Sequence, residues 1–195
     1  MATGGEFFWH PGGVERTERH SLGATVWMTG LSGSGKSTIA VAFEQALLAR
    51  GRPAYVLDGD NLRHGLNADL GLSDADRAEN IRRVGHVAAL LADAGLVAIA
   101  PLVSPFARAR AGVRSVHDAA GLPFFEVWVS TPVQECERRD TKGLYARYRR
   151  GELTGLTGLD APYESPARPE LVLPAHEIDV ETAVARLLAL VDPRG

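Results

Sequence analysis

A glycine-rich turn between two apolar segments constrains the fold of this chain more than any other feature of its sequence. The octapeptide Gly30-Leu-Ser-Gly-Ser-Gly-Lys36-Ser37 matches the pattern G-x-x-x-x-G-K-[ST]. It follows an apolar run expected to be a strand (residues 24–30) and precedes a run with helical periodicity (residues 36–50). A strand that enters a helix through such a turn is typical of α/β domains that bind phosphate, because the glycines turn backbone N–H groups toward an anion.

The turn predicts a site for ATP and Mg²⁺. The Lys36 ammonium is expected to reach the β- and γ-phosphates, and the Ser37 hydroxyl is expected to bind the metal ion. Of the 21 basic residues only Lys36 and Lys142 are Lys, so both are candidates for a role that needs a compact ammonium. The expected nucleotide-binding residues are Gly30, Leu31, Ser32, Gly33, Ser34, Gly35, Lys36, Ser37 and Thr38.

The rest of the chain alternates short apolar runs with helical periods, which favours a parallel sheet with crossover helices. We expect further strands over residues 54–58, 96–103, 124–131 and 170–173, and helices over residues 74–94, 105–120, 132–139 and 180–191. The predicted fold is an α/β, P-loop NTPase-type, three-layer α/β/α domain with a mostly parallel five-stranded sheet. The length suits a single domain over residues 1–195.

Two segments fall outside this alternation. Residues 1–23 precede the first expected strand and are interpreted as a lead-in. Residues 140–169 hold four glycines, three prolines and part of a basic cluster, without clear periodicity. An irregular stretch of about 30 residues inside a compact domain is usually functional, so we expect a mobile lid there.

Composition and charge exclude several classes of protein. The formal net charge of −3 argues against a general nucleic-acid binder, which is usually basic. The N-terminus has no basic start followed by an apolar run, and the most apolar stretch, residues 87–103, is interrupted by Asp93. A bilayer span needs about 20 apolar residues. We therefore expect a cytoplasmic protein that binds neither nucleic acid nor a membrane.

Polar residues after the second expected strand predict where a phosphoryl acceptor binds. Asp58 and Asp60 follow that strand, and ligands of open parallel sheets lie beyond the carboxyl ends of strands. Their carboxylates could orient Mg²⁺ or take the proton of an acceptor hydroxyl, and an Asp-Gly turn with a helix-capping carboxylate is the alternative. Arg63 follows, and then Arg77 and Asn80, which share a helix face that suits either an anionic ligand or solvent.

Several longer motifs resemble those of the adenylylsulfate kinases, which phosphorylate adenosine 5′-phosphosulfate. In chain order the motifs are FFWHPGGVERTER, GLSGSGKST, DGDNLRHGL, DLGLSDADRAENIRR, SPF and DTKGLYARYRRGELTGLTGLDAPYESP, and the resemblance extends over residues 7–191. It implies transfer of a phosphoryl group from ATP to the 3′-hydroxyl, which gives ADP and 3′-phosphoadenosine 5′-phosphosulfate. It also implies a homodimer and a functional link to ATP sulfurylase, which makes the acceptor.

The same resemblance implies roles for individual residues. Asp60 is expected near both the acceptor hydroxyl and the metal ion. Arg63, Arg77 and Asn80 are expected at the phosphosulfate end of the acceptor. Lys142, in the KGLY motif, is expected to reach the nucleotide substrate from the lid.

Two substrate-binding positions, Leu72 and Leu156, depart from the family pattern. The family commonly carries phenylalanines there, whose rings enclose the adenine of the substrate. Stacking a base on an aromatic ring contributes roughly 1–3 kcal/mol, whereas leucine offers apolar contact without a π-face. The departure leaves open a related P-loop kinase that acts on a hydroxyl of another small molecule. A non-catalytic nucleotide-binding module is the third alternative, and intact Lys36, Ser37 and Asp60 disfavour it.

Ser104, the third candidate catalytic residue beside Lys36 and Asp60, allows two interpretations. The family is described with a phosphoserine intermediate at the serine of this S-P-F motif. The residues themselves favour Ser104 as a helix N-cap with Pro105 at the first helical position. We expect a positioning role, since direct in-line transfer needs no covalent intermediate.

Overall fold

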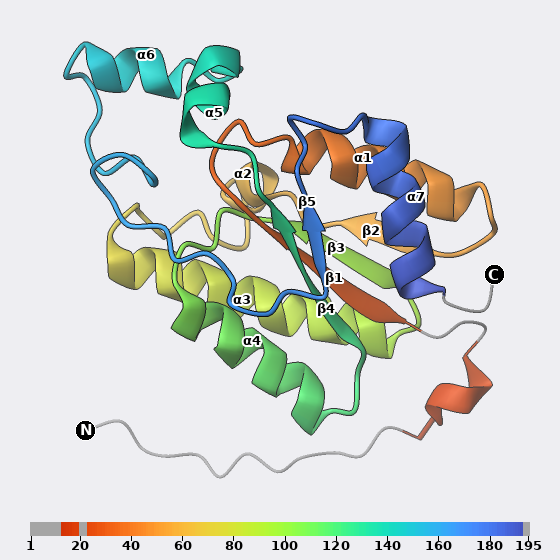
Figure 1. Ribbon diagram of the computed structural model, residues 1–195. Coiled ribbons are helices and arrows are strands. Elements are labelled where there is room, and N and C mark those ends of the chain that lie inside the picture. The colour runs from red at the N-terminus through yellow and green to blue at the C-terminus, as the bar shows by residue number, and fades with distance from the viewer. Residues whose placement is uncertain (1–12, 20–22, 193–195) are drawn as a thin grey trace, which may run out of the picture.

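The computed structural model describes residues 13–19 and 23–192, and a twisted parallel sheet lies at its centre (Figure 1). The strands are β1 (Ala24–Thr29), β2 (Ala54–Val56), β3 (Val97–Pro101), β4 (Phe124–Val129) and β5 (Leu171–Leu173). Their order is β2-β3-β1-β4-β5, and every neighbouring pair is parallel. All carboxyl ends therefore meet at one edge, and the strand order reverses beside β1, where ligands of open α/β sheets bind.

Helices cover both faces of the sheet (Figure 1). The helices on one face are α1 (Lys36–Leu48) and α7 (Val180–Val191), and those on the other are α3 (Asp74–Asp93) and α4 (Ala107–Ala119). Phe43 and Leu187 are buried against the first face, and Trp27, Ile81 and Val84 on the second. Burial of each such side chain contributes about 1.5–3 kcal/mol, which holds the layers together. The predicted three-layer α/β/α fold is confirmed.

Strands β3 and β4 end two residues earlier than their apolar patterns predict. The pattern continues past the end of β3 because Leu102 is still buried, although it belongs to a loop. The loop after β3 includes Ser104, and the loop after β4 includes Thr131. An apolar pattern indicates which residues are buried and not which form the hydrogen bonds of a sheet. The pattern therefore predicts strands that are too long wherever the following loop is also buried.

The segment predicted as a lid, residues 140–169, contains a short helix that the sequence pattern did not reveal. Helix α6 (Leu144–Arg149) follows α5 (Val133–Arg139), and both lie beyond the carboxyl ends of the strands (Figure 1). The Asp140 carboxylate accepts hydrogen bonds from the backbone N–H groups of Tyr145 and Ala146, which fixes the first turn of α6. Six residues are too few to show a helical period. The mobility of this segment stays a prediction.

The described part of the lead-in is tied to the end of α3. Arg16 and Arg19 both form ion pairs with Asp93, at 2.5 and 2.9 Å. The rest of the predicted lead-in, with its FFWH sequence, lies outside the described residues. Within the ranges that the structure describes, we find no helix that combines the length and the apolar character needed to cross a membrane.

Candidate active site

A cavity of about 610 Å³ lies at the carboxyl ends of the strands and brings most of the predicted site residues together. The loop between β1 and α1 together with the first residues of α1, called here the phosphate loop (residues 30–38), lines one end. Helix α3, the loop after β3 and the lid line the other end. The predicted residues that line it are Ser32, Gly33, Gly35, Lys36, Ser37, Thr38, Asp60, Arg63, Leu72, Arg77, Asn80, Ser104, Lys142 and Leu156. Gly30, Leu31 and Ser34 belong to the loop but do not line the cavity.

The phosphate loop has a backbone shape that requires its glycines. Gly30 and Gly35 have φ of 153° and 105°, a region that other residues rarely adopt. A Cβ at Gly30 would lie 2.6 Å from the carbonyl oxygen of Val129. Thr131, in the loop after β4, supports the phosphate loop, because its hydroxyl donates to the Ser34 carbonyl at 2.8 Å. The loop enters α1 at Lys36, so unpaired N–H groups of the first turn of this helix can bind an anion.

Lys36 folds back over the loop that carries it. Its Nζ donates to the carbonyl oxygens of Gly30 and Leu31 at 2.9 and 2.7 Å, and to the Ser34 hydroxyl at 3.3 Å. The side chain is buried, and burial lowers the pKa of the ammonium to about 7. A phosphate at this end of the cavity favours the charged form, so Lys36 can change its charge when a nucleotide binds.

Asp58 and Asp60 have different surroundings. Asp58 caps α2 (Gly59–Leu62) by accepting from the backbone N–H groups of Asp60 and Asn61, so the capping alternative holds for this residue. Its other carboxylate oxygen accepts a hydrogen bond from the Ser37 hydroxyl at 3.4 Å. The sequence paired Ser37 with Asp60 as metal ligands, whereas the structure places Asp58 beside Ser37.

The oxygen atoms around Ser37 fit Mg²⁺. This ion prefers hard oxygen ligands, and proteins usually hold it with one or two carboxylates while phosphates and water complete its shell. The hydroxyl of Ser37 and the carboxylate of Asp58 supply such oxygens on one side of the phosphate loop. Over residues 13–19 and 23–192, no three His, Cys, Asp or Glu side chains form a cluster that could hold a metal ion. The protein ligands for Mg²⁺ in this part of the chain would be the oxygens of Ser37 and Asp58, with phosphate and water oxygens completing the shell.

Lys142 joins the lid to the acceptor side of the cavity. Its ammonium forms an ion pair with the Asp60 carboxylate, across 82 residues of sequence. Both side chains are more than half exposed, so solvent screens this pair and its net contribution to stability is small. The contact nevertheless brings the second of the two lysines to the residue predicted to orient the acceptor.

The two arginines predicted at the acceptor end both bind backbone carbonyls. Arg63 donates to the carbonyls of Leu70 and Gly71, at 3.0 and 3.1 Å. Arg77 donates to the Leu72 carbonyl at 2.8 Å and reaches across the cavity to the lid. There it donates to the Thr157 hydroxyl at 2.6 Å and to the Gly155 carbonyl at 2.7 Å. These arginines therefore shape both the loop before α3 and the lid.

Asn80 is oriented by a residue that sequence reasoning missed. Asn67 is fully buried, and its side-chain Nδ2 donates to Asn80 Oδ1 at 2.9 Å. Because this bond occupies the oxygen of the Asn80 amide, the Nδ2 group of Asn80 is left to donate to a ligand. The Oδ1 atom of Asn67 is the buried side-chain oxygen without a partner among the described residues. No motif pointed to Asn67, since a lone Asn in a loop carries no pattern.

The two leucines that replace family phenylalanines both line the cavity. Leu72 precedes α3 and is 61% exposed, so it offers its side chain to a ligand. Leu156 belongs to the lid and is 7% exposed, because it packs against Cys136 and Tyr145. The structure brings these positions together as the sequence predicts, but only Leu72 is free to cover a base.

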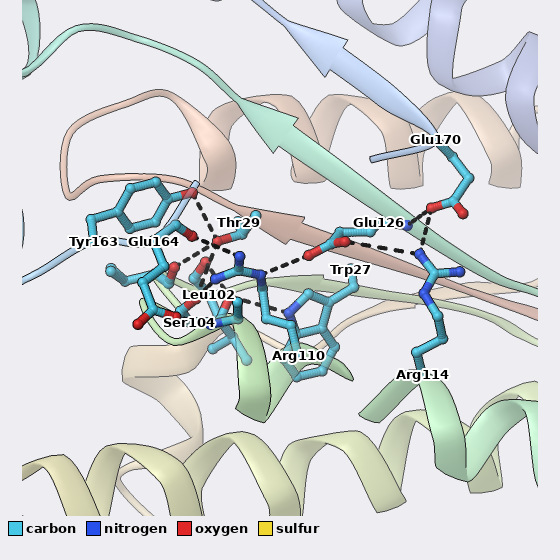
Figure 2. A network of polar contacts seen from close by, with 12 residues as sticks. Trp27, Thr29, Leu102, Ser104, Arg110, Arg114, Glu126, Tyr163, Glu164 and Glu170 are labelled. Carbon is cyan, nitrogen blue, oxygen red and sulfur yellow. Dashed lines mark hydrogen bonds and ion pairs between the residues drawn. The ribbon is translucent and has the colours of Figure 1, made fainter. Parts of the chain in front are cut away.

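Ser104 is not a helix cap, contrary to the sequence prediction. Helix α4 begins at Ala107 and not at Pro105, and the Ala107 N–H is capped by the Glu164 carboxylate at 2.7 Å. Ser104 has φ of 38° and is buried, and its hydroxyl accepts a hydrogen bond from Trp27 Nε1 at 3.1 Å (Figure 2). Pro105 predicted that the helix starts at that residue. In the structure the helix starts two residues later, at Ala107, whose N–H is capped by Glu164, a residue distant in sequence.

Two further residues lie beside the phosphate loop, one in the lid and one at the end of α5, and neither was singled out in the sequence. Tyr145 of α6 is buried, and its hydroxyl donates to the carbonyl of Ser32 at 3.0 Å. Arg139 of α5 lines the cavity, and its guanidinium lies 3.7 Å from the position of a Cβ built on Gly35. The basic run from 138 to 150 predicted a nucleotide-covering surface without showing which of its members face inward.

The comparisons with known proteins agree on one family. The family model described as adenylylsulphate kinase matches residues 22–174. The chain is 47% identical over 195 residues to an adenylyl-sulfate kinase of Emericella nidulans, and the match covers 95% of each. It is 59% identical over 167 residues to the bifunctional enzyme CysN/CysC of Mycobacterium tuberculosis, covering 85% of this chain. The matched region spans only about a quarter of that longer relative, 27% of its length.

A solved structure gives the same answer at the level of the fold. The M. tuberculosis APS kinase CysC, in complex with AMPPNP and APS, superposes with a TM-score of 0.85 at 55% sequence identity. The match covers 88% of this chain and 99% of that one. Both the P-loop kinase fold and the family predicted from the motifs are confirmed. The chain belongs to the adenylylsulphate kinase family.

Proposed function

We propose that this protein transfers the γ-phosphoryl group of ATP to the 3′-hydroxyl of adenosine 5′-phosphosulfate. One observation carries the proposal: a single cavity joins the phosphate loop to Asp60, Arg63, Arg77 and Asn80. The one cavity therefore offers neighbouring places for a nucleoside triphosphate and for an anionic acceptor. Membership of the adenylylsulphate kinase family supports the same acceptor.

Phosphoryl transfer depends mainly on positioning the two substrates and on neutralising the charge of the phosphates. The acceptor 3′-oxygen forms a bond to the γ-phosphorus while the bond to the β–γ bridging oxygen breaks, so that ADP leaves. The acceptor hydroxyl donates its hydrogen bond to the Asp60 carboxylate, which receives the proton. Lys36 supplies positive charge to the β- and γ-phosphates, and Lys142 neutralises Asp60 from the lid side.

Mg²⁺ is proposed to bind with ATP at Ser37 and the carboxylates of Asp58 and Asp60. When bound, the ion neutralises charge on the phosphate oxygens. Ser37 and Asp58 already lie within 3.4 Å of one another, so this part of the site needs little rearrangement. The ion pair between Asp60 and Lys142 keeps the third oxygen donor on the same side of the cavity.

Ser104 is proposed to position the acceptor and not to carry a phosphoryl group. Ser104 is 3% exposed and its hydroxyl accepts a hydrogen bond from Trp27, so the hydroxyl is held by a buried side chain. A covalent intermediate would require this hydroxyl to leave its partner and face the γ-phosphate. Direct transfer to the acceptor avoids that rearrangement.

We also propose a homodimer and a functional link to ATP sulfurylase. The acceptor arises by adenylylation of sulfate, a different reaction from the one proposed here, so another active site has to supply it. Light scattering of the purified protein measures its mass and tests the dimer. Co-purification with that enzyme tests whether the link is physical.

The test of the proposed function is to measure ADP release from Mg-ATP with and without adenosine 5′-phosphosulfate, and to resolve the nucleotide products by chromatography. One 3′-phosphoadenosine 5′-phosphosulfate for each ADP is the expected result. ATP binding without this product would show that the chain acts on another hydroxyl. Absence of turnover with any acceptor would favour a nucleotide-binding module.

A further inference from the structure

A buried polar network lies behind the acceptor end of the cavity, and Arg110 of α4 is at its centre (Figure 2). The side chain of Arg110 is 3% exposed. Its Nε donates to the Glu126 carboxylate at 2.6 Å, its Nη1 to the Ser104 carbonyl at 2.6 Å, and its Nη2 to the Glu164 carbonyl at 2.7 Å. One guanidinium thus joins β4, the loop after β3 and the far end of the lid.

The first of these partners is a strained part of the cavity wall. Ser104 has a positive φ of 38°, and such a conformation costs a residue other than glycine about 1–3 kcal/mol. Its neighbours fix it, since Trp27 Nε1 donates to its hydroxyl and Thr29 Oγ1 contacts its carbonyl at 3.4 Å. Ser104 and Pro105 both line the cavity. Strain held at a cavity wall indicates that the exact position of this wall matters for function.

The second partner is the point where the lid returns to the body of the protein. The Glu164 N–H donates to the Pro105 carbonyl at 2.9 Å, and the Glu164 carboxylate accepts from the N–H of Ala107. The hydroxyl of Tyr163 lies 3.1 Å from Thr29 Oγ1. The end of the lid is therefore connected to the same wall that Ser104 forms, and Arg110 binds both.

We propose that Arg110 is a positioning residue for phosphoryl transfer, which holds the Ser104–Pro105 wall and the lid end at Glu164 in one arrangement around the acceptor. This inference rests on the proposed function. Arg110 does not line the cavity, so it acts through Ser104 and Glu164. The wall follows β3 and lies on the side of α3. Binding of the acceptor is therefore expected to depend on this wall more strongly than binding of the nucleotide at the phosphate loop does.

Arg114 provides a matched control on the same helix. It lies about one turn from Arg110, donates to the Glu170 carboxylate at 2.7 Å and lies 3.9 Å from the Glu126 carboxylate. Its guanidinium also stacks over Phe124, at 4.8 Å from the ring centre. These partners belong to β4 and to the residue before β5, so Arg114 shares the charge environment of Arg110 without its connection to the cavity wall.

The experiment compares Arg110→Lys, Arg114→Lys and Glu126→Gln in steady-state assays with both substrates. In Arg110→Lys the ammonium still neutralises Glu126 but cannot span three acceptors, because it lacks the planar fork of arginine. Its kcat/KM for adenosine 5′-phosphosulfate is expected to fall about tenfold or more, while the KM for ATP stays within about twofold. For Arg114→Lys and Glu126→Gln, the kcat/KM for adenosine 5′-phosphosulfate and the KM for ATP are both expected to stay within about twofold of the unaltered protein. In each of these variants Arg110 still donates to the carbonyls of Ser104 and Glu164.

Three kinetic results would overturn the proposal. Full activity in Arg110→Lys would show that positive charge is sufficient. An equal loss in Glu126→Gln would assign the effect to the ion pair, and an equal rise in the KM of both substrates would assign it to general loosening of the fold. The matched control excludes an effect common to any arginine of α4.

Hydrogen exchange at the Glu164 amide gives a readout that needs no turnover. The amide donates to Pro105, and faster exchange in Arg110→Lys than in Arg114→Lys is expected if Arg110 holds these segments together. Equal exchange in the two variants would contradict the proposal. If the unaltered protein makes no product, the proposed function fails, and the exchange result still decides whether Arg110 fixes the wall and the lid.

Discussion

The two ends of the cavity differ in the groups that form them: backbone at the phosphate end and side chains at the acceptor end. The phosphate end consists of backbone whose shape depends on glycines, and the single lysine in it is buried. The acceptor end consists of side chains that project from α2, α3, the lid and the loops beside them. Among these, Asp60, Leu72 and Lys142 are each more than half exposed.

This difference separates what every nucleotide shares from what distinguishes one acceptor from another. A backbone cradle binds phosphate whichever side chains surround it, and altering it disturbs the turn itself. Side chains on α2, α3 and the lid can be exchanged one at a time. Changes at the phosphate end are therefore expected to affect turnover with any acceptor, whereas changes at the other end alter affinity for a particular acceptor.

The largest effect is expected at the phosphate end, from Lys36→Met. Removing the only positive side chain that the loop itself supplies should lower kcat about a thousandfold, because charge on the transferring group is then poorly neutralised. Steady-state ADP release measures this, with Arg50→Met, at an exposed arginine in the turn after α1, as the control. Retention of more than a tenth of the activity would remove Lys36 from the transfer step.

The pH dependence of nucleotide binding tests the same residue without turnover. Burial lowers the pKa of Lys36 to about 7, so the free protein is largely uncharged there at higher pH. Bound phosphate favours the ammonium, and binding must then take up a proton. Affinity for Mg-ATP is therefore expected to fall as the pH rises above 7, by up to about tenfold per unit. Calorimetry from pH 7 to 9 measures the slope, and Lys36→Arg, which stays charged, should abolish it.

An intermediate effect is expected where the lid meets the acceptor end. Lys142→Met removes the ion pair with Asp60 and should lower kcat about tenfold, since positioning by the lid is lost while the phosphate loop is intact. The matched control is Arg147→Met, which changes another basic residue of the lid, on α6, that does not line the cavity. A rise in the KM for ATP alone would place Lys142 at the phosphate end and would contradict its assignment to the acceptor end.

A smaller effect of opposite sign is expected from Leu72→Phe. Phenylalanine restores a π-face at an exposed position of the cavity, so the KM for adenosine 5′-phosphosulfate should fall several-fold, equivalent to about 1 kcal/mol. Leu66→Phe, at another exposed leucine outside the cavity, serves as the control. An unchanged KM in Leu72→Phe would show that this leucine does not face the base.

The smallest effect on turnover is expected from Ser104→Ala. The hydroxyl points to Trp27, so its removal should leave kcat within about threefold while costing about 1–3 kcal/mol of stability for the unpaired indole N–H. Thermal unfolding and steady-state kinetics measure the two effects separately. Complete loss of activity with unchanged substrate binding would favour the phosphoserine route.

Much of the phosphate end could be predicted from the sequence because its information is local. The glycines, Lys36 and Ser37 occupy consecutive positions, and the strand before them and the helix after them are visible as apolar patterns. The three-layer fold follows from the same alternation along the chain. At this end, neighbours in sequence are also neighbours in the site.

The acceptor end could be predicted only in part, because its contacts join residues distant in sequence. The family resemblance indicated Arg77 and Lys142, but not that Arg77 binds the lid at Gly155 or that Lys142 binds Asp60. Ser104 was misassigned as a cap because the true cap of α4, Glu164, lies 57 residues from Ala107. Asn67 belongs to no motif, and only its buried hydrogen bond reveals it.

The hydrogen bond from Tyr145 in the lid to the carbonyl of Ser32 in the phosphate loop has a thermodynamic consequence. If the loop adopts one shape when nucleotide is bound, and that shape favours this bond, then nucleotide and lid position are linked. Linkage is reciprocal: the factor by which ATP stabilises the docked lid equals the factor by which the docked lid tightens ATP. Tyr145→Phe removes this hydrogen bond. The variant should therefore change the dissociation constant of ATP, although the Tyr145 hydroxyl binds the backbone of the loop and not the nucleotide.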